Sequence, residues 1–335
     1  MTATMDAATG TTETAEMTLV AAENSALDLE MARDPKVVLL GEDIADPAGG
    51  VFKVSKGLST KYGTARVRAT PIVEQSIVGT SVGLALGGYR PVAEIMFFDF
   101  ITMAMDQLVN HAAKFRYMSG GATPTPITVR TVVGSSRFGA QHAQSLEAWF
   151  MHTPGVKVVM PSSAADAKGL LTAAIRDDDP VLFIEHINLA YGRKGQVPVG
   201  EHVVPIGKAN MLRSGDAVTL VTYGAQVPIV LDAAEQLAAD GIEAEVIDLR
   251  SLVPLDIETV LESVERTRRA VVVHEATRFA GPGAEIAAQV NEHLFGELLA
   301  PVQRLGAGFV PIPFSPSLSN FPTAAVVVES VKSIL

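Results

Sequence analysis

One acidic residue, Glu74, stands alone in an otherwise uncharged stretch, residues 69–79 (ATPIVEQSIVG). Because ionising an acid among apolar neighbours is costly, this pattern predicts a raised pKa that suits proton transfer. Thr70 and Pro71 read as an N-cap and a first helical residue, which would place Glu74 in the first turn of a helix. A Glu there also meets the positive end of the helix dipole, so a purely structural role is the alternative.

Two further segments carry residue types that could serve a site. His142 follows a polar loop, residues 134–141, where an imidazole could transfer protons or stabilise an oxyanion, or simply cap the next helix. Met96 and three phenylalanines lie where a strand gives way to a helix, with Asp99 as the predicted N-cap. Ligands bind beyond the carboxyl ends of parallel strands, so these side chains could line the binding site of a flat ring. Alternatively, they could belong to the hydrophobic core.

The composition narrows the class of protein. The 335 residues are 48% hydrophobic, enough for two cores, and the net charge of −11 argues against a nucleic acid partner. The absence of cysteine excludes disulfides, thiolate zinc sites and iron–sulfur clusters, and it fits a cytoplasmic protein. The longest apolar stretch, residues 95–109, contains two aspartates and is shorter than the roughly 20 residues of a membrane span. We therefore expect a soluble protein with no membrane partner.

Sequence motifs that hold phosphate or metal are missing. Neither a Gly-x-x-x-x-Gly-Lys loop nor a Gly-x-Gly-x-x-Gly turn after a strand occurs, and no grouping of His, Asp and Glu has metal-ligand spacing. Gly281, Pro282 and Gly283 precede a helical pattern but lack the third glycine. If Glu74 serves a phosphorylated cofactor, the phosphate-binding half of the site is absent from this sequence.

Apolar runs of strand length alternate with helical patterns along the chain. The predicted strands of the first part are residues 37–40, 91–96, 127–130, 156–159 and 181–184, and its predicted helices are 17–33, 74–87, 99–118, 142–152 and 164–176. The later part has predicted strands 218–222, 244–247 and 270–273 and predicted helices 226–239 and 256–267. Continuous rather than alternating hydrophobicity implies strands covered on both faces, as in a parallel sheet of βαβ units.

These patterns predict an α/β protein of two domains, the larger built on a parallel sheet. Residues 1–16, mostly Thr and Ala, are expected to be a disordered tail, and residues 17–190 the larger domain. Residues 191–207 are rich in glycine and proline and form the predicted linker. Residues 208–335 are expected to fold as the smaller domain.

Six ordered blocks of sequence resemble one family. They are TPIVE (70–74), MFFDF (96–100), AAKFRYMSGG (112–121), QHAQS (141–145), DAKGLL (166–171) and IRDDDP (175–180). The family is the beta subunit of the thiamine-diphosphate-dependent first component of 2-oxo acid and acetoin dehydrogenase complexes. The resemblance runs from about residue 17 to the end of the chain.

The resemblance implies a fold and a set of partners. The fold would be a transketolase-like pyrimidine-binding domain followed by a transketolase C-terminal-like domain. Two alpha and two beta chains would form a heterotetramer, with thiamine diphosphate between unlike chains and a lipoyl-bearing acyltransferase as the next component. In that family a Gly-Asp-Gly motif of the alpha subunit holds magnesium and the diphosphate. This sequence contains no Gly-Asp-Gly, so the resemblance accounts for the missing half of the site.

The resemblance also implies roles for particular residues. Glu74 would hydrogen-bond a ring nitrogen of the aminopyrimidine and so promote proton removal from the thiazolium carbon. Ile72, Met96 and Phe100 would pack around the aminopyrimidine ring. His142 matches the family histidine on the substrate side, which assists proton movement and transfer to the lipoyl group.

A potassium site in some members of the family implies a second set of residues here. It uses a strand carbonyl and a loop at a helix end, and the matching positions are Ile127, Ala174, Ile175, Asp177 and Asp179. Carbonyl and carboxylate oxygens suit a hard cation. An acidic turn without an ion is the alternative.

The substrate is indicated less sharply. Residues 114–118, 130–134 and 145–150 look most like acetoin dehydrogenase, then pyruvate dehydrogenase, then branched-chain enzymes. Residues 135–138 (SSRF) replace the smaller residues usual before this histidine, so Arg137 and Phe138 could alter the substrate pocket. Two other interpretations stay open: a non-catalytic α/β scaffolding subunit, and a one-chain transketolase-like enzyme that binds the cofactor alone.

Overall fold

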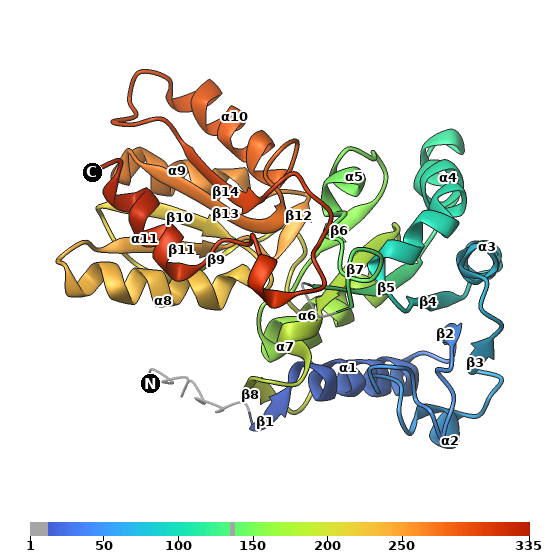
Figure 1. Cartoon of the computed structure of the whole chain (residues 1–335). Helices are drawn as coiled ribbons and strands as arrows, with labels where there is room; N and C mark the ends of the chain where they lie inside the picture. Colours follow the sequence, from blue (N-terminus) through green and yellow to red (C-terminus); the bar gives the residue numbers. More distant parts are fainter. Residues whose placement is uncertain (1–12, 135–137) are drawn as a thin grey trace, which may run out of the picture.

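The computed structural model describes residues 13–134 and 138–335, which form two α/β domains (Figure 1). The first domain is built on a seven-stranded sheet with the order β12-β6-β7-β5-β4-β2-β3. Its strands are β2 (Val37–Glu42), β3 (Val67–Thr70), β4 (Arg90–Ile95), β5 (Thr128–Val133), β6 (Lys157–Val159), β7 (Val181–His186) and β12 (Ser251–Val253). Its helices are α1 (Leu19–Arg33), α2 (Leu58–Tyr62), α3 (Glu74–Leu86), α4 (Ala113–Met118), α5 (Glu147–Met151), α6 (Ala164–Arg176) and α7 (Ile187–Ala190).

The second domain has a five-stranded sheet with the order β14-β13-β10-β11-β9. Its strands are β9 (Asn210–Arg213), β10 (Val218–Thr222), β11 (Ala244–Asp248), β13 (Ala270–Thr277) and β14 (Gln303–Ala307). Its helices are α8 (Gln226–Ala239), α9 (Ile257–Thr267), α10 (Pro282–Leu294), α11 (Ala324–Lys332) and a short 3-10 turn, η3 (Pro316–Leu318). Within this five-stranded sheet, as far as the structure describes it, only β9 runs antiparallel to its neighbour.

Continuous apolar runs produced parallel strands, as the sequence pattern predicts. Every residue of β2, β5 and β7 is buried, and these strands lie in parallel ladders inside the first sheet. A strand with both faces buried must be apolar at nearly every position, because helices cover both sides of the sheet. The predicted α/β fold with a parallel-sheet first domain is therefore confirmed.

The predicted tail is too long by several residues. Residues 1–12 lie outside the described part of the chain, but β1 (Thr14–Thr18) pairs antiparallel with β8 (Lys194–Pro198). Residues 14–16 are therefore ordered, and part of the predicted linker is a strand. A two-stranded ladder between segments so far apart in sequence leaves no local pattern, because neither strand is continuously apolar.

Helix α3 begins later than predicted. Thr70 is the last residue of β3 and lies opposite Glu42 of β2. It therefore belongs to the sheet and does not cap the helix. Pro71 is in the connecting loop, the N-cap is Val73 with an extended φ of −151°, and Glu74 is the first helical residue. The predicted capping by Thr70 is wrong, although the location of Glu74 in the first turn is right.

The predicted helix 99–118 is divided into three parts with different pitch. A 3-10 segment, η1 (Phe98–Ala104), and a π-helical segment, η2 (Asp106–Ala112), precede α4. Phe98, Ile101 and Ala104 are buried at a spacing of three residues, which matches the three residues per turn of a 3-10 helix. The buried residues then follow at a spacing of four, which suits the wider π-helical turn.

The second domain contributes a strand to the first sheet. After β11 the chain crosses to the first domain, where β12 adds antiparallel to β6 at the edge of the seven-stranded sheet. One buried apolar cluster also continues from the first domain into the second, with Phe98 and Val158 on one side and Leu252 and Ile286 on the other. The two domains are therefore joined by both backbone pairing and a shared core.

Buried polar groups also meet across the domain boundary. The contacts are Tyr223 Oη to Glu147 Oε1 (2.8 Å), His186 Nε2 to Glu275 Oε2 (2.7 Å), Arg250 to Asp166 (3.0 Å) and Ser162 to Asp248. Burial raises the pKa of Glu147 to about 7 and that of Asp248 to about 7. Both acids therefore carry a proton well above the pH at which an exposed carboxyl loses it.

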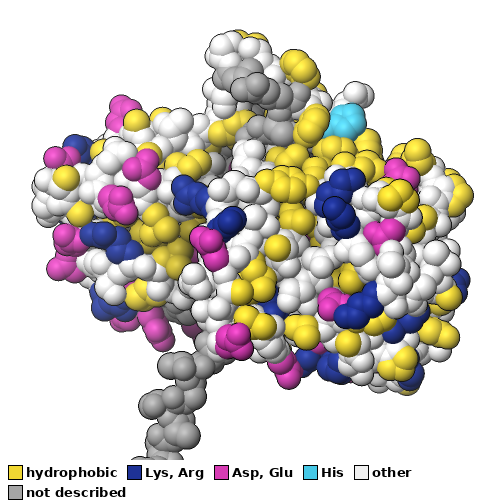
Figure 2. Space-filling model, turned by 90° about the horizontal axis from the view of Figure 1, so that it is seen from below, with side chains coloured by type: hydrophobic (Ala, Val, Ile, Leu, Met, Phe, Trp, Pro, Cys, Tyr) yellow, Lys and Arg dark blue, Asp and Glu magenta, His cyan; other side chains and the backbone are white. Residues whose placement is uncertain are grey.

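The surface does not gather one kind of charge on the face seen in Figure 2, where Lys and Arg stand among Asp and Glu and hydrophobic groups lie between them. Among the described residues, no helix is long and apolar enough to cross a membrane.

Gly155 allows the loop before β6 to pass close to α4. Its φ is +102°, and a Cβ there would lie only 2.0 Å from the carbonyl oxygen of Ala113. We predict that Gly155→Ala destabilises the protein by about 3 kcal/mol or more, because a strained backbone is combined with a backbone clash. Denaturant unfolding monitored by circular dichroism measures this loss.

Gly241 provides the matched control. It follows α8 in the left-handed conformation, φ +78°, but has open space around its missing Cβ. Gly241→Ala should cost only about 1–2 kcal/mol, the strain of the left-handed backbone alone. Equal losses in the two variants would show that the approach to Ala113 does not matter.

Asp248 should make stability depend on pH. Its folded pKa of about 7 lies above the usual aspartate pKa of 3.8, so between these values the folded state holds a proton that the unfolded state has lost. The stability that this proton contributes is full below the unfolded pKa and falls as pH rises toward 7. Asp248→Asn, which never ionises, should therefore gain stability over wild type by on the order of 2 kcal/mol from pH 5 to pH 8. Urea unfolding at both pH values, with the exposed Asp216→Asn as control, tests this; a constant difference between variant and wild type contradicts it.

Candidate active site

The predicted site segments follow strands that end at one edge of the first sheet. The ladders place Glu42 of β2 opposite Thr70 of β3, Gly41 opposite Glu94 of β4, and Ile95 opposite Thr131 of β5. The loops after β3, β4 and β5 therefore leave the sheet on the same side, at the carboxyl ends where α/β proteins bind ligands. These are the loops that carry Glu74, residues 96–100 and His142.

Glu74 is a buried carboxylate at the start of α3, with 9% of its surface exposed. Within the described residues its side chain makes no hydrogen bond or ion pair, whereas Ile72 beside it is 78% exposed. A largely buried acid that has no donor in its own chain is suited to a partner outside this chain. An exposed isoleucine next to it offers that partner an apolar surface.

Glu42 is a second acid near Glu74 that sequence reasoning missed. Burial raises the pKa of the Glu42 carboxyl, and the neighbouring charge of Glu74 raises it further. Its Oε1 is buried and has no hydrogen-bond partner in the described part of the structure. The sequence could have pointed to Glu42 through its position, because it is the one acid at the end of the apolar run that forms the buried strand β2.

A cluster of aromatic rings surrounds Phe97 and contains two of the predicted site residues, Phe100 and His142. The ring of His142 lies edge-on to Phe97 at 5.0 Å and to Phe100 at 5.2 Å, measured between ring centroids. Phe52 and Phe100 also meet Phe97 edge-to-face. Edge-to-face rings at these distances attract each other and fix the orientation of the imidazole. Met96 and Phe100 both pack against the buried apolar cluster that contains Phe97.

Asp99 holds the loop of His142 in position. Its Oδ1 accepts hydrogen bonds from the side-chain amide of Gln144 at 2.7 Å and from the backbone N–H of Gln144 at 3.3 Å. Asp99 is therefore an anchor for the loop, because the cap of η1 is Phe97 and the predicted N-cap role of Asp99 is wrong. The same anchor explains why α5 begins only at Glu147 and not at residue 142.

A buried cluster of charges lies deeper in the first domain. The Arg130 guanidinium contacts Glu94 at 2.9 Å and Glu185 at 2.5 Å, with Glu23 at 3.7 Å. Three carboxyls around one cation leave excess negative charge, so burial and the neighbouring Glu185 raise the pKa of Glu23 well above its usual range. Burial likewise raises the pKa of Glu185. This cluster joins α1, β4, β5 and β7 below the edge where the site loops leave the sheet.

The residues of the predicted potassium site lie just before β5 and at the end of α6. The carbonyl of Ile127 accepts from Val181 N at 2.9 Å, and that of Ala174 accepts from Asp177 N at 3.3 Å. Ile175, Asp177 and Asp179 follow at the end of α6.

Basic side chains already bind several oxygens of this turn. Arg90 donates to the carbonyl oxygen of Asp177 at 2.9 Å, Lys157 contacts the Asp177 carboxylate at 2.7 Å, and Arg116 contacts Asp179 at 2.8 Å. These three cations balance the acidic charge of the turn, so the arrangement fits a potassium ion poorly. Among the described residues, no group of three or more His, Asp or Glu is arranged to hold a metal ion.

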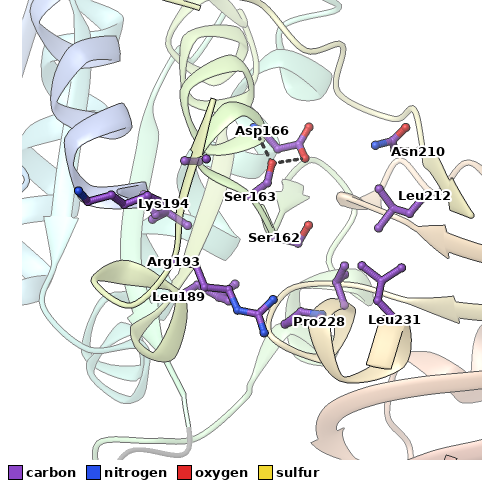
Figure 3. A pocket seen from close by; sticks show the side chains of 14 residues that line it. Ser162, Ser163, Asp166, Leu189, Arg193, Lys194, Asn210, Leu212, Pro228 and Leu231 are labelled. Carbon is purple, nitrogen blue, oxygen red and sulfur yellow. Dashed lines mark hydrogen bonds between the residues drawn. The ribbon is translucent and has the colours of Figure 1, made fainter. Parts of the chain in front are cut away.

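A pocket of about 280 Å³ lies elsewhere, between the two domains (Figure 3). Ser162, Ser163 and Asp166 line it from the first domain, and Asn210 and Pro228 line it from the second. Ser163 donates to the Asp166 carboxylate inside it. None of the predicted site residues belongs to this pocket.

The arrangement and the comparisons define the class of protein. The chain matches the model of the transketolase pyrimidine-binding domain over residues 15–191 and that of the transketolase C-terminal domain over residues 207–322. A solved split-gene transketolase, described as an inactive beta4 tetramer, has a similar fold, with a TM-score of 0.79, 24% identity, and coverage of 96% of this chain and 99% of that one. The molecule is thus a two-domain protein of the transketolase type.

The more similar relatives identify the family. The beta subunit of acetoin:2,6-dichlorophenolindophenol oxidoreductase of Cupriavidus necator is 47% identical, covering 96% of this chain and 98% of the relative. The mitochondrial pyruvate dehydrogenase E1 component subunit beta of Caenorhabditis elegans is also 47% identical (98% and 95% covered), and the 2-oxoisovalerate dehydrogenase subunit beta of Bacillus subtilis is 45% identical (91% and 94%). The chain belongs to the family of beta subunits of acetoin and 2-oxo acid dehydrogenases, as the sequence blocks predicted.

We predict that Gln144→Ala loosens the His142 loop while the sheet stays intact. The variant loses the side-chain hydrogen bond to the Asp99 carboxylate and keeps the one from its backbone N–H, and a hydrogen bond to a charged group contributes about 1.5–3 kcal/mol. Hydrogen exchange followed by mass spectrometry should show faster exchange in peptides covering residues 138–146. Gln236→Ala, which removes a surface contact to Asp232 on α8, is the control. Unchanged exchange in the loop would mean that the Gln144 side chain does not hold it.

Proposed function

We propose that this chain is the beta subunit of a thiamine-diphosphate-dependent dehydrogenase. It would cleave acetoin or decarboxylate pyruvate and pass the acetyl group to a lipoyl domain of an acyltransferase component. Family membership supports the general activity, and relatives that act on acetoin and on pyruvate are equally similar, at 47% identity. A branched-chain 2-oxo acid is the third substrate to test, because the relative named for 2-oxoisovalerate is 45% identical.

The observation that carries the proposal is the state of Glu74. It is buried, lacks a hydrogen-bond partner within the described chain, and follows the strand beside Glu42. Glu74 would hydrogen-bond a ring nitrogen of the aminopyrimidine of thiamine diphosphate.

The other predicted residues would bind the cofactor ring and move a proton on the substrate side. Ile72, Met96 and Phe100 would pack against the aminopyrimidine ring and exclude water from it. When bound, thiamine diphosphate supplies the nucleophilic carbon and the electron sink that the chemistry needs. His142, held edge-on by Phe97 and Phe100, would move a proton on the substrate side.

A second chain must complete the site in this proposal. No Gly-Asp-Gly occurs in the sequence, and no metal-binding group of acids is present among the described residues, so magnesium and the diphosphate would be held by an alpha subunit. We propose an assembly of two alpha and two beta chains in the cytoplasm. The potassium site stays a prediction.

Glu74→Gln tests the proposal directly. In a tetramer reconstituted with an alpha subunit that supports wild-type activity, we expect thiamine-dependent dye reduction with acetoin or pyruvate to fall about 10²–10⁴-fold. The cause would be the loss of a group that can accept and return the proton, since glutamine keeps the size and the polarity. Initial rates at saturating thiamine diphosphate and Mg²⁺ measure the loss.

Glu258→Gln is the control, because Glu258 also begins a helix but is exposed. If Glu74 only favours its helix through the dipole, both variants should shift the melting temperature slightly and leave the rates unchanged. Full activity of Glu74→Gln would therefore remove the catalytic role and leave the scaffolding interpretation.

A further inference from the structure

Phe138, which replaces a smaller residue before His142, has no part in the cofactor binding and proton transfer proposed above. It lies on the loop after β5, and 50% of its side chain is exposed. Its ring meets the ring of Phe97 at 5.6 Å between centroids, with an interplanar angle of 69°. Phe97 itself is 9% exposed, so Phe138 covers part of a buried ring and turns its remaining surface outward.

Phe138 shares its aromatic neighbour with His142. Phe97 contacts both residues edge-to-face, at 5.6 Å and 5.0 Å, and it also contacts Phe100 at 6.0 Å. The ring proposed to face the cofactor, the histidine proposed to face the substrate, and Phe138 are therefore arranged around one phenyl group. Phe138 and His142 are thus separated by no more than the Phe97 ring.

The second domain supports the backbone next to Phe138. Gly139 has a φ of +78°, and a Cβ there would lie 3.4 Å from Cδ2 of Phe314, which belongs to the segment between β14 and α11. Phe314 thus covers the outer side of this glycine. The loop that bears Phe138 is held by Phe314 on one side and by the Phe97 ring on the other.

We propose that Phe138 is a specificity-determining residue that restricts the substrate to donors of a methyl-bearing acyl group, such as acetoin and pyruvate, and disfavours branched chains. The proposal rests on the proposed dehydrogenase function. Phe138 and His142 contact the same Phe97 ring, so we expect the Phe138 ring to take up space that a branched acyl chain would need. Each extra methylene that an apolar pocket cannot accept changes kcat/KM by about 10–200-fold.

The test uses the reconstituted tetramer and three donors: acetoin, pyruvate and 2-oxoisovalerate. The variants are Phe138→Ala and the milder Phe138→Leu, with Phe295→Ala as control because Phe295 is 88% exposed at the end of α10. For Phe138→Ala we expect the ratio of kcat/KM for 2-oxoisovalerate to that for pyruvate to rise by about tenfold or more. Phe138→Leu should raise the ratio less, and Phe295→Ala should leave it at the wild-type value.

Several results would overturn the inference. A wild-type enzyme that prefers 2-oxoisovalerate would contradict it. A kcat/KM ratio that stays within about twofold of wild type in both Phe138 variants would also contradict it, even if all rates fall together. A purely structural role for Phe138 predicts this unchanged ratio. A wild-type tetramer that is inactive with all three donors would instead reject the proposed function, and the specificity inference with it.

Discussion

The parallel ladder joining β3, β2, β4 and β5 is the constraint on which the site depends. Because these strands run in the same direction, the loops that follow them meet at one edge, although the strands are spread over residues 37–133. A slip of one residue in a ladder would turn a strand's side chains to the opposite face. Such a slip of β5 would separate Arg130 from Glu94 and Glu185, so these buried ion pairs help to set where Glu74 and His142 lie relative to each other.

Much of the fold was predictable because its strongest signals are local. Helices α6 and α8 begin and end at the predicted residues, since an amphipathic helix repeats its apolar pattern every turn. The β1–β8 ladder and the crossing of β12 into the first sheet were not predicted, because both join distant segments. The segment 98–112 was predicted as part of a regular helix. Its division into a 3-10 and a π-helical part goes with buried residues spaced by three and then by four, and burial cannot be read from the sequence alone.

The candidate site was predictable only in part. Glu74 is conspicuous as a lone acid in an uncharged stretch, and the family blocks mark His142 and Phe100 as site residues. Glu42 and the Asp99–Gln144 anchor were missed, because their importance depends on burial and on neighbours supplied by other strands. Glu147 and Asp248 illustrate the same limit, since nothing adjacent in sequence indicates an acid that remains protonated near pH 7.

The path of β12 has a consequence for how the chain folds as it is synthesised. The first six strands of the larger sheet emerge before residue 187, but the strand that covers β6 lies at residues 251–253. Until those residues leave the ribosome, the outer edge of β6 has no partner within the sheet, and an open edge can pair with strands of other molecules. Completion of the first domain therefore waits for the first three strands of the second, β9, β10 and β11, and a ribosome that stalls before β12 would release a chain prone to aggregation.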